Sequence, residues 1–386
     1  MRVTVIGSGT MGQGIAQVAA TAGWYVHLSD VSAAVLEQAR KNIQYYLNRH
    51  EAKGKIDKGS AASILQRITW AQPAGDVTGS DLVIEAVSED LRVKQKLFQS
   101  LESNVASDTL FATNTSSLSV TAIASALQRP GNLLGIHFFN PAPLMPLVEI
   151  IPAEQTPGAV VNKAITWMTQ WGKLPVQAKD TPGFIVNRIA RPFYSEALRI
   201  YEEGLADFKT IDQAMIQYGG FRMGPFQLMD LIGNDVNYSV TETIWKASYF
   251  EPRYKPCSIQ KRMIAAGRLG KKTGKGFYSY SGEDPTHFSS GHKIPSWIFD
   301  RILFMLVNEA AEAVYYKIAS IPDVEKAMCF GAGYPKGLLK WANEIGIANV
   351  VNEMDDLFNT YHEERYRCNP LLRKMAKENS LFDLTF

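Results

Sequence analysis

One histidine and one carboxylate, His137 and Glu149, lie on two apolar runs of the stretch 136–150, which reads IHFFNPAPLMPLVEI. The turn between the runs, 140–143, contains two prolines and cannot continue a strand. We therefore expect the chain to leave one strand and re-enter the sheet with the carboxylate beside the imidazole. Such a pair fixes the tautomer of the ring and stabilises its protonated form, as a general base requires. A half-buried histidine satisfied by a neighbouring acid explains the stretch equally well.

The chain begins with a short β-branched run, 3–6, followed at once by GSGTMG at 7–12 and an alanine-rich helical pattern, 15–22. A strand, a tight glycine turn and a helix N-terminus together form the binding element for a dinucleotide pyrophosphate. Asp30 ends the next predicted strand, 30 − 7 = 23 residues past the first glycine. An acid there bonds the adenosine ribose and repels a 2′-phosphate, which favours NAD over NADP. The alternative is an ordinary glycine turn, with Asp30 as the next helix cap.

A polar cluster, Asn-Thr-Ser-Ser at 114–117, follows a predicted strand at 109–113. Because ligands bind outside the carboxyl ends of parallel strands, this cluster belongs at the same sheet edge as the histidine. Small hydroxyl residues before a helix are most often N-caps. We expect Ser117 to cap the following helix and Ser116 to face the cleft.

The composition narrows the classes of protein that fit. A chain of 386 residues with 46% hydrophobic content can form two or three domains. A net charge of +2 gives no reason to expect a nucleic-acid or membrane partner. Three widely spaced cysteines and six scattered histidines predict neither a disulfide framework nor a metal site. With no basic leader and no long apolar span, we expect a soluble cytoplasmic protein.

Several longer motifs resemble the 3-hydroxyacyl-CoA dehydrogenase family. The first three are GSGTMGQGIAQ (7–17), NTSSL (114–118) and GIHFFNPAPLMPLVEI (135–150); TPGFIVNRI (181–189), FRMGPF (221–226) and GRLGKKTGKGFYSY (267–280) follow in the same order. The resemblance covers nearly all of residues 1–281. It implies NAD-dependent oxidation of an L-3-hydroxyacyl-CoA, in which His137 takes the hydroxyl proton while hydride leaves for the cofactor.

The same resemblance assigns roles residue by residue. It implies a catalytic group of Ser116, His137, Glu149 and Asn187, in which Ser116 and Asn187 also hold the substrate. The implied NAD contacts are Gly7, Ser8, Gly9, Thr10, Met11, Gly12, Asp30, Glu89, Lys94, Ser116, Asn140 and Lys272. By themselves, Glu89 and Lys94 would be ordinary residues of a helix start.

Lys53 is the implied contact to the CoA phosphates. It lies in a lysine-rich turn, 48–58, that would otherwise read as a solvated helix end. One departure lies nearby, because Tyr46 stands where some family members carry a serine that helps to hold CoA. The resemblance therefore does not assign a CoA contact to position 46.

The strands stop near residue 180 and helical periodicity takes over, with a kink expected at Pro192 in the helix 185–203. The helical region then repeats at one offset, 300 − 187 = 113. The matching pairs are 187–189 with 300–302, 196–197 with 309–310, 214–215 with 327–328, and 224 with 337. The expected domains are a Rossmann-type α/β domain (1–180), two tandem all-α copies (181–281 and 295–386) and a linker (282–294).

Asn187 becomes Asp300 in the second copy, so we expect that copy to be catalytically silent and to pack against the first. In shorter members of the family such helical domains pair between subunits. The duplication therefore suggests a monomer with an internal pseudo-dimer, and a homodimer of the whole chain stays open.

The acyl chain is less constrained. The run FRMGPFQLMDLIGNDVN (221–237) resembles 3-hydroxyadipyl-CoA and 3-hydroxybutyryl-CoA dehydrogenases of bacterial aromatic and fatty-acid breakdown. Arg222 could pair with the distal carboxylate of a dicarboxylyl chain. The plainer alternative is a surface arginine or a structural salt bridge. Two other functions fit the same scaffold: a dehydrogenase of a small non-CoA hydroxy acid, and a non-catalytic NAD-binding protein.

Overall fold

The computed structural model describes residues 1–71, 77–280 and 294–385. The chain forms two compact units, Met1–Phe184 and Ile185–Phe386. The predicted linker, 282–294, falls almost wholly outside the described residues.

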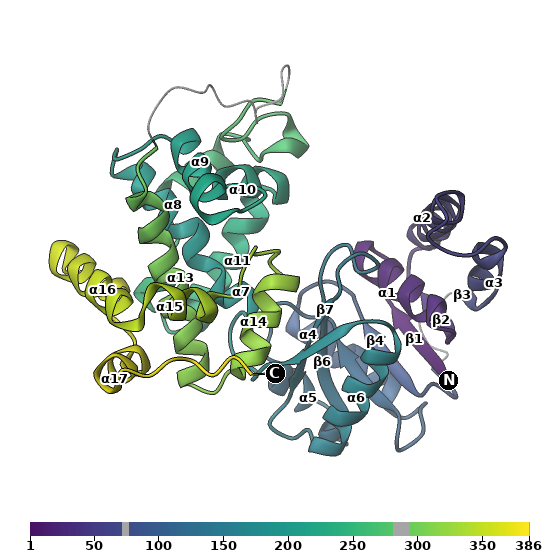
Figure 1. Ribbon diagram of the computed structural model, residues 1–386. Coiled ribbons are helices and arrows are strands. Elements are labelled where there is room, and N and C mark those ends of the chain that lie inside the picture. Colours follow the sequence, from purple (N-terminus) through teal and green to yellow (C-terminus); the bar gives the residue numbers. More distant parts are fainter. Residues whose placement is uncertain (72–76, 281–293, 386) are drawn as a thin grey trace. The chain divides into compact units, whose positions relative to one another are not determined.

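The first unit is built on one sheet whose strands lie in the order β3-β2-β1-β4-β5-β6-β7-β8 (Figure 1). Neighbouring strands are parallel except β6 and β7, which are antiparallel. The central strands are buried on both faces, as expected where helices cover both sides of a parallel sheet. The strands are β1 (Arg2–Ile6), β2 (Tyr25–Ser29), β3 (Ile68–Ala71), β4 (Leu82–Glu85), β5 (Leu110–Thr113), β6 (Leu133–Phe138), β7 (Leu147–Pro152) and β8 (Leu174–Gln177).

Amphipathic helices connect these strands. The helix α2, for example, buries Leu36, Ala39, Ile43 and Leu47, a spacing of three and four residues that keeps one face on the core. The helices of the unit are α1 (Thr10–Thr21), α2 (Ala33–Ala52), α3 (Ser60–Gln66), α4 (Leu91–Glu102), α5 (Val120–Ala124) and α6 (Gly158–Gln170), with a short 3₁₀ turn η1 (Pro130–Asn132).

The helix caps differ from the sequence prediction. The α5 helix begins after Ser119, whose hydroxyl accepts the Ala122 N–H, so the prediction that Ser117 caps it was wrong. At α4 the cap is Asp90, which accepts the Val93 N–H. Ser117 and Glu89 are thereby left for other contacts.

The second unit is helical and contains both sequence copies. Its first copy comprises α7 (Val186–Ile189), α8 (Arg191–Glu202), α9 (Phe208–Gly219), α10 (Pro225–Ile232), α11 (Asn234–Ala247), η2 (Pro252–Tyr254), α12 (Ser258–Ala265) and η3 (Lys271–Thr273). The second comprises α13 (Trp297–Tyr315), α14 (Ile321–Phe330), α15 (Leu338–Ile345), α16 (Ile347–Tyr361), η4 (Glu364–Tyr366) and α17 (Pro370–Glu378).

The two copies align in sequence almost element for element. Helix α15 begins and ends 113 residues after α10, because 225 + 113 = 338 and 232 + 113 = 345. The first helix differs: the expected kink at Pro192 is a full break at Ala190 between α7 and α8, whereas α13 is continuous. Proline lacks an N–H and its ring clashes with the preceding turn, and the equivalent of Pro192 in α13 is Met305.

Helix α13 packs against α7, α8 and α9 of the first copy, and the contacts are reciprocal. Arg188 pairs with Glu309 at 3.1 Å, and Arg301 pairs with Glu196 at 2.7 Å. These are equivalent residues with the copies exchanged, since 188 + 113 = 301 and 196 + 113 = 309. The pattern is that of a two-fold symmetric interface contained in one chain.

Candidate active site

His137 and Glu149 lie directly opposite each other on the antiparallel strands β6 and β7. The imidazole Nδ1 lies 2.7 Å from Glu149 Oε2; His137 is 6% exposed and Glu149 is fully buried. The prediction that the chain re-enters the sheet with this pair together is confirmed. With Nδ1–H donating to the carboxylate, the ring presents its Nε2 lone pair as the basic atom.

Aromatic rings flank this histidine. The ring centroids of Phe139 and Phe184 lie 4.6 Å and 5.8 Å from that of His137. Apolar walls exclude water and keep the ring in one orientation, which strengthens its bond to Glu149. Sequence reasoning did not single out either phenylalanine.

A second polar network lies at the ends of β4 and β5. Glu85, fully buried at the end of β4, accepts a hydrogen bond from Lys94 Nζ at 2.5 Å and another from the Thr113 hydroxyl at 2.7 Å. Lys94, only 1% exposed, also pairs with Glu89 at 3.2 Å. The sequence analysis missed Glu85, whose signal was a carboxylate at the end of an otherwise apolar strand.

Glu89 joins this network to the 114–117 cluster. It accepts hydrogen bonds from the Thr115 hydroxyl (2.6 Å), the Ser116 N–H (3.0 Å) and the Ser117 hydroxyl (3.1 Å). Burial alone would raise the pKa of Glu89, but Lys94 and these donors outweigh it and hold the pKa below its usual value. An ionised Glu89 therefore fixes the loop that carries Ser116.

The glycine turn between β1 and α1 has the geometry that a dinucleotide requires. A Cβ at Gly7 would meet the Ala86 carbonyl oxygen at 2.5 Å, and one at Gly12 would meet the Gly7 carbonyl oxygen at 1.7 Å. A Cβ at Gly9 would meet nothing within 4 Å, so open space lies beside this backbone. Close packing at two glycines and open space at the third fit a pyrophosphate at the start of α1.

Asp30 is tied to this turn and caps no helix. It accepts hydrogen bonds from the N–H (2.7 Å) and hydroxyl (3.0 Å) of Ser8 and from the Ser32 N–H (2.9 Å), and Ser32 caps α2. Burial would raise the pKa of Asp30, but these donors hold it below the ordinary value. The Asp30 carboxylate beside the glycine turn is thus ionised.

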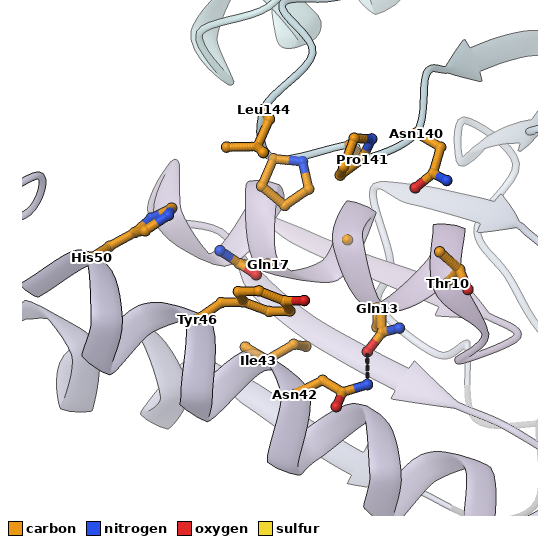
Figure 2. Close-up of a pocket in the computed structure, with 13 residues that line it drawn as sticks. Thr10, Gln13, Gln17, Asn42, Ile43, Tyr46, His50, Asn140, Pro141 and Leu144 are labelled. Atoms are coloured by element: carbon orange, nitrogen blue, oxygen red, sulfur yellow. Dashed lines mark hydrogen bonds between the residues drawn. The ribbon is translucent and has the colours of Figure 1, made fainter. Parts of the chain in front are cut away.

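A pocket of about 380 Å³ lies between α1, α2 and the 140–144 loop (Figure 2). Gln13 and Gln17 come from α1, and Tyr46 and His50 come from α2. Lys53, which ends α2, is exposed and lies three residues past His50, on the same helical face. The pocket and the lysine therefore follow one side of α2.

The 140–144 loop that forms the other wall of the pocket, and carries Asn140, is held from behind by a buried lysine. Lys173 Nζ donates to the carbonyl oxygens of Ala142 at 2.5 Å and Met145 at 2.8 Å. Burial lowers the pKa of Lys173 to about 8. Sequence reasoning missed this lysine, because nothing local connects it to a loop about 30 residues earlier.

Three predicted site residues belong to the helical unit. Asn187 lies half-buried on α7, and Arg222 is exposed in the turn before α10. Lys272 is exposed and pairs with Asp235 at 2.6 Å. The structure describes each of these three residues within the helical unit.

No group of three or more possible metal ligands occurs among the described residues, and no helix in that part of the chain could span a membrane. A glycine turn at the head of a parallel sheet, with an oriented histidine at the same edge, defines the class of dinucleotide-dependent dehydrogenases.

Comparisons with known proteins define the family. Residues 2–181 match the NAD-binding domain of 3-hydroxyacyl-CoA dehydrogenases, and residues 183–280 and 297–384 each match the C-terminal domain. The chain is 35% identical over 460 aligned positions to 3-hydroxyadipyl-CoA dehydrogenase of Escherichia coli K12, covering 97% of both chains. It is 42% identical over 285 positions to the human mitochondrial hydroxyacyl-coenzyme A dehydrogenase, covering 72% of this chain and 90% of that protein.

A solved structure, of a 3-hydroxybutyryl-CoA dehydrogenase from E. coli K12, superimposes with a TM-score of 0.93 at 35% identity and covers 98% of both chains. The chain belongs to the 3-hydroxyacyl-CoA dehydrogenase family; it is an oxidoreductase, and its cofactor is NAD.

Proposed function

We propose that this chain oxidises an L-3-hydroxyacyl-CoA to the 3-oxoacyl-CoA, with His137 as the general base. The observation that carries the proposal is the 2.7 Å bond between His137 Nδ1 and Glu149, which leaves Nε2 to take the proton of the 3-hydroxyl. As the O–H bond breaks, its electron pair forms the carbonyl and hydride leaves the same carbon. NAD, when bound, accepts that hydride. Glu149 stabilises the imidazolium that forms.

We assign the cofactor contacts to residues around the glycine turn and the neighbouring strand ends. Lys94 is too enclosed to touch the cofactor, so its role is to hold Glu89 in place. The remaining contacts that we propose are Gly7, Ser8, Gly9, Thr10, Met11, Gly12, Asp30, Glu89, Ser116, Asn140 and Lys272.

Substrate contacts are proposed on both units. Ser116 and Asn187 would hydrogen-bond the reacting oxygen or the thioester carbonyl and so position the substrate. The pocket beside α2 suits the flexible arm of CoA, with Lys53 beyond it for the phosphates. Tyr46 faces this pocket, so its side chain would lie beside the bound CoA.

The curated relative and the solved structure from E. coli K12 bear different substrate names, 3-hydroxyadipyl-CoA and 3-hydroxybutyryl-CoA. We propose that this chain acts on one of these two substrates. We also propose a cytoplasmic location, which the free cysteines Cys257, Cys329 and Cys368 support. The reciprocal contacts between the helical copies support a monomer, and light scattering of the eluted protein would distinguish it from a homodimer.

The test is NADH oxidation by acetoacetyl-CoA and 3-oxoadipyl-CoA, catalysed by wild type and His137→Ala. We expect kcat to fall on the order of a hundredfold or more in the variant, because proton transfer loses its base. Binding of NADH, followed by fluorescence, should be unchanged. His362→Asn, at an exposed helix end, is the matched control. Equal rates for His137→Ala and wild type would refute the assignment of the base, and a wild type inactive on both esters would refute the substrate class.

A further inference from the structure

The helical unit buries five arginines among its described residues: Arg188, Arg191, Arg253, Arg301 and Arg365. Four of them form ion pairs with glutamates. Arg191, 4% exposed, has no carboxylate partner in that part of the chain. A buried guanidinium without a counter-charge is costly, so its retention calls for a reason.

The contacts of Arg191 use only part of its donor set. Nε donates to the Asn187 carbonyl oxygen at 2.7 Å, across the break between α7 and α8. Nη1 donates to the Thr241 hydroxyl oxygen at 3.1 Å, and Thr241 donates its own proton to the Asn237 carbonyl. No described residue accepts a hydrogen bond from Nη2. One edge of the guanidinium therefore keeps free N–H donors.

Two buried phenols, Tyr194 and Tyr334, lie close enough to feel the charge of this cation. The guanidinium carbon lies 5.0 Å from the ring centroid of Tyr194. Tyr334 comes from the second copy; it packs against Phe193 and Phe221, and its buried hydroxyl has no partner among the described residues. Burial raises the pKa of both phenols, and the Arg191 charge opposes that rise in each. Both hydroxyls therefore stay protonated donors within reach of the cation's field.

The internal repeat shows that pairing of the copies does not need this polar set. At the offset of 113, Arg191 corresponds to Phe304, Tyr194 to Val307 and Tyr334 to Phe221. All three equivalents are apolar. By contrast, the residues of the reciprocal ion pairs, Arg188 with Glu309 and Arg301 with Glu196, are the same in both copies. The polar cluster occurs once, whereas the scaffold occurs twice.

We propose that Arg191, Tyr194 and Tyr334 form a carboxylate-binding site that receives the distal end of a dicarboxylyl acyl chain. A guanidinium edge and two phenol hydroxyls supply the donors that a carboxylate accepts. This inference rests on the proposed oxidation of a 3-hydroxyacyl-CoA and specifies its acyl group.

The position of the site suits that acyl group. Arg191 lies four residues after Asn187, about one helical turn, and is bonded to the Asn187 backbone. Asn187 is the proposed contact to the reacting oxygen. In a 3-hydroxyadipyl chain two methylenes separate the hydroxyl-bearing carbon from the carboxylate. This short separation matches a guanidinium that lies about one helical turn from Asn187. Arg222, the arginine that the sequence suggested for this role, is exposed.

The experiment compares kcat/KM for 3-oxoadipyl-CoA with that for 3-oxohexanoyl-CoA, which has the same chain length and no carboxylate. Variants are Arg191→Met, Tyr334→Phe and Arg222→Met. Arg367→Met, which removes an exposed arginine, is the matched control. We expect the ratio of the two kcat/KM values to fall on the order of ten- to a hundredfold in Arg191→Met and by a smaller factor in Tyr334→Phe. Arg222→Met and Arg367→Met should keep the wild-type ratio.

Tyr334→Phe is the decisive variant, because it removes only a hydroxyl without a described partner and leaves the Asn187 contact intact. The proposal would be overturned if both Arg191→Met and Tyr334→Phe kept the wild-type ratio of kcat/KM values. It would also be overturned if the ratio fell in Arg222→Met and in no other variant. A wild type that reduces both esters equally would overturn it while leaving the dehydrogenase function standing. A wild type that reduces neither ester would instead overturn the proposed function itself.

Discussion

Lys94 is a buried cation that pairs with two carboxylates at and just after the end of β4. Its ammonium group, 1% exposed, pairs with both Glu85 and Glu89. The two carboxylates in turn hold Thr113 and the 115–117 loop. Removing the cation would leave the buried Glu85 carboxylate facing the Glu89 carboxylate with no cation between them.

We predict that Lys94→Met destabilises the protein by about 3–5 kcal/mol at neutral pH, since a buried pair is broken from one side. In wild type the pKa of Glu89 is lower than in the unfolded chain, so Glu89 stabilises the protein at pH values above the unfolded pKa. This stability is lost as pH falls through the folded pKa. In the variant the pKa of Glu89 should rise, because the Lys94 charge that lowers it is gone, so the stability of the variant should increase on acidification. Urea unfolding from pH 7 to 5 measures both slopes. Lys96→Met, on the exposed side of the same helix, is the control. Parallel pH profiles for Lys94→Met and wild type would contradict this account.

At the scale of elements, apolar runs predicted the strands that lead to the site, β1, β2, β5, β6 and β7, whereas the short strands β3 and β8 at the two ends of the sheet were not predicted. Helical periodicity predicted α1 and the helical unit, because apolar residues recur there at the spacing of a helix. The strand pair that unites His137 and Glu149 followed from one proline-rich turn. Helix caps did not follow, because several adjacent hydroxyls can each cap a helix and only the backbone angles select Ser119. The Arg191 cluster was also missed, since it joins α8 to the loop after α14, far apart in sequence.

The 140–145 loop depends on Lys173, which supplies a second prediction at this scale. Burial lowers the pKa of Lys173 to about 8, below its unfolded value, so the unfolded chain binds more protons between that pH and the unfolded pKa. Stability therefore rises with pH across this window as the cost of the buried charge is relieved. We expect this contribution to be about 1–3 kcal/mol between pH 8 and 10.5.

Lys173→Met should lack this rise, which denaturant unfolding at several alkaline pH values would show as a difference from wild type. Lys179→Met is the control, because it replaces an exposed lysine beyond β8 that does not touch the 140–145 loop. If wild type and Lys173→Met keep a constant difference in free energy of unfolding across that window, the lysine does not titrate there.

At the scale of the whole molecule, the two helical copies are held by buried carboxylates that each serve several partners. Glu309 receives Arg188, Arg253 and the Tyr254 hydroxyl, and Glu196 receives Arg301, Arg365 and the Tyr366 hydroxyl. Each set draws its donors mainly from the opposite copy. Loss of one glutamate therefore removes a buried charge from two guanidinium groups at once, although Arg253 would keep Glu312 and Arg301 would keep Glu203.

We predict that Glu309→Gln lowers the free energy of unfolding by about 3–5 kcal/mol, because its arginines stay buried without that charge. Glu364→Gln, in an exposed pair with Arg367, should change it by less than about 1 kcal/mol. Denaturant unfolding followed by circular dichroism makes the comparison. Equal effects of the two substitutions would mean that the buried cluster adds nothing beyond a surface pair.

Enclosing both copies in one chain has a consequence for how such an interface can change. In a dimer of identical subunits every substitution appears on both sides of the axis. Here a residue such as Tyr334 can be altered while its counterpart Phe221 is kept, so the two sides can diverge independently. The second copy has no glycine turn and no histidine pair of its own. A single substitution in it can nevertheless change substrate selection on one side of the interface, which is impossible in a dimer of identical subunits.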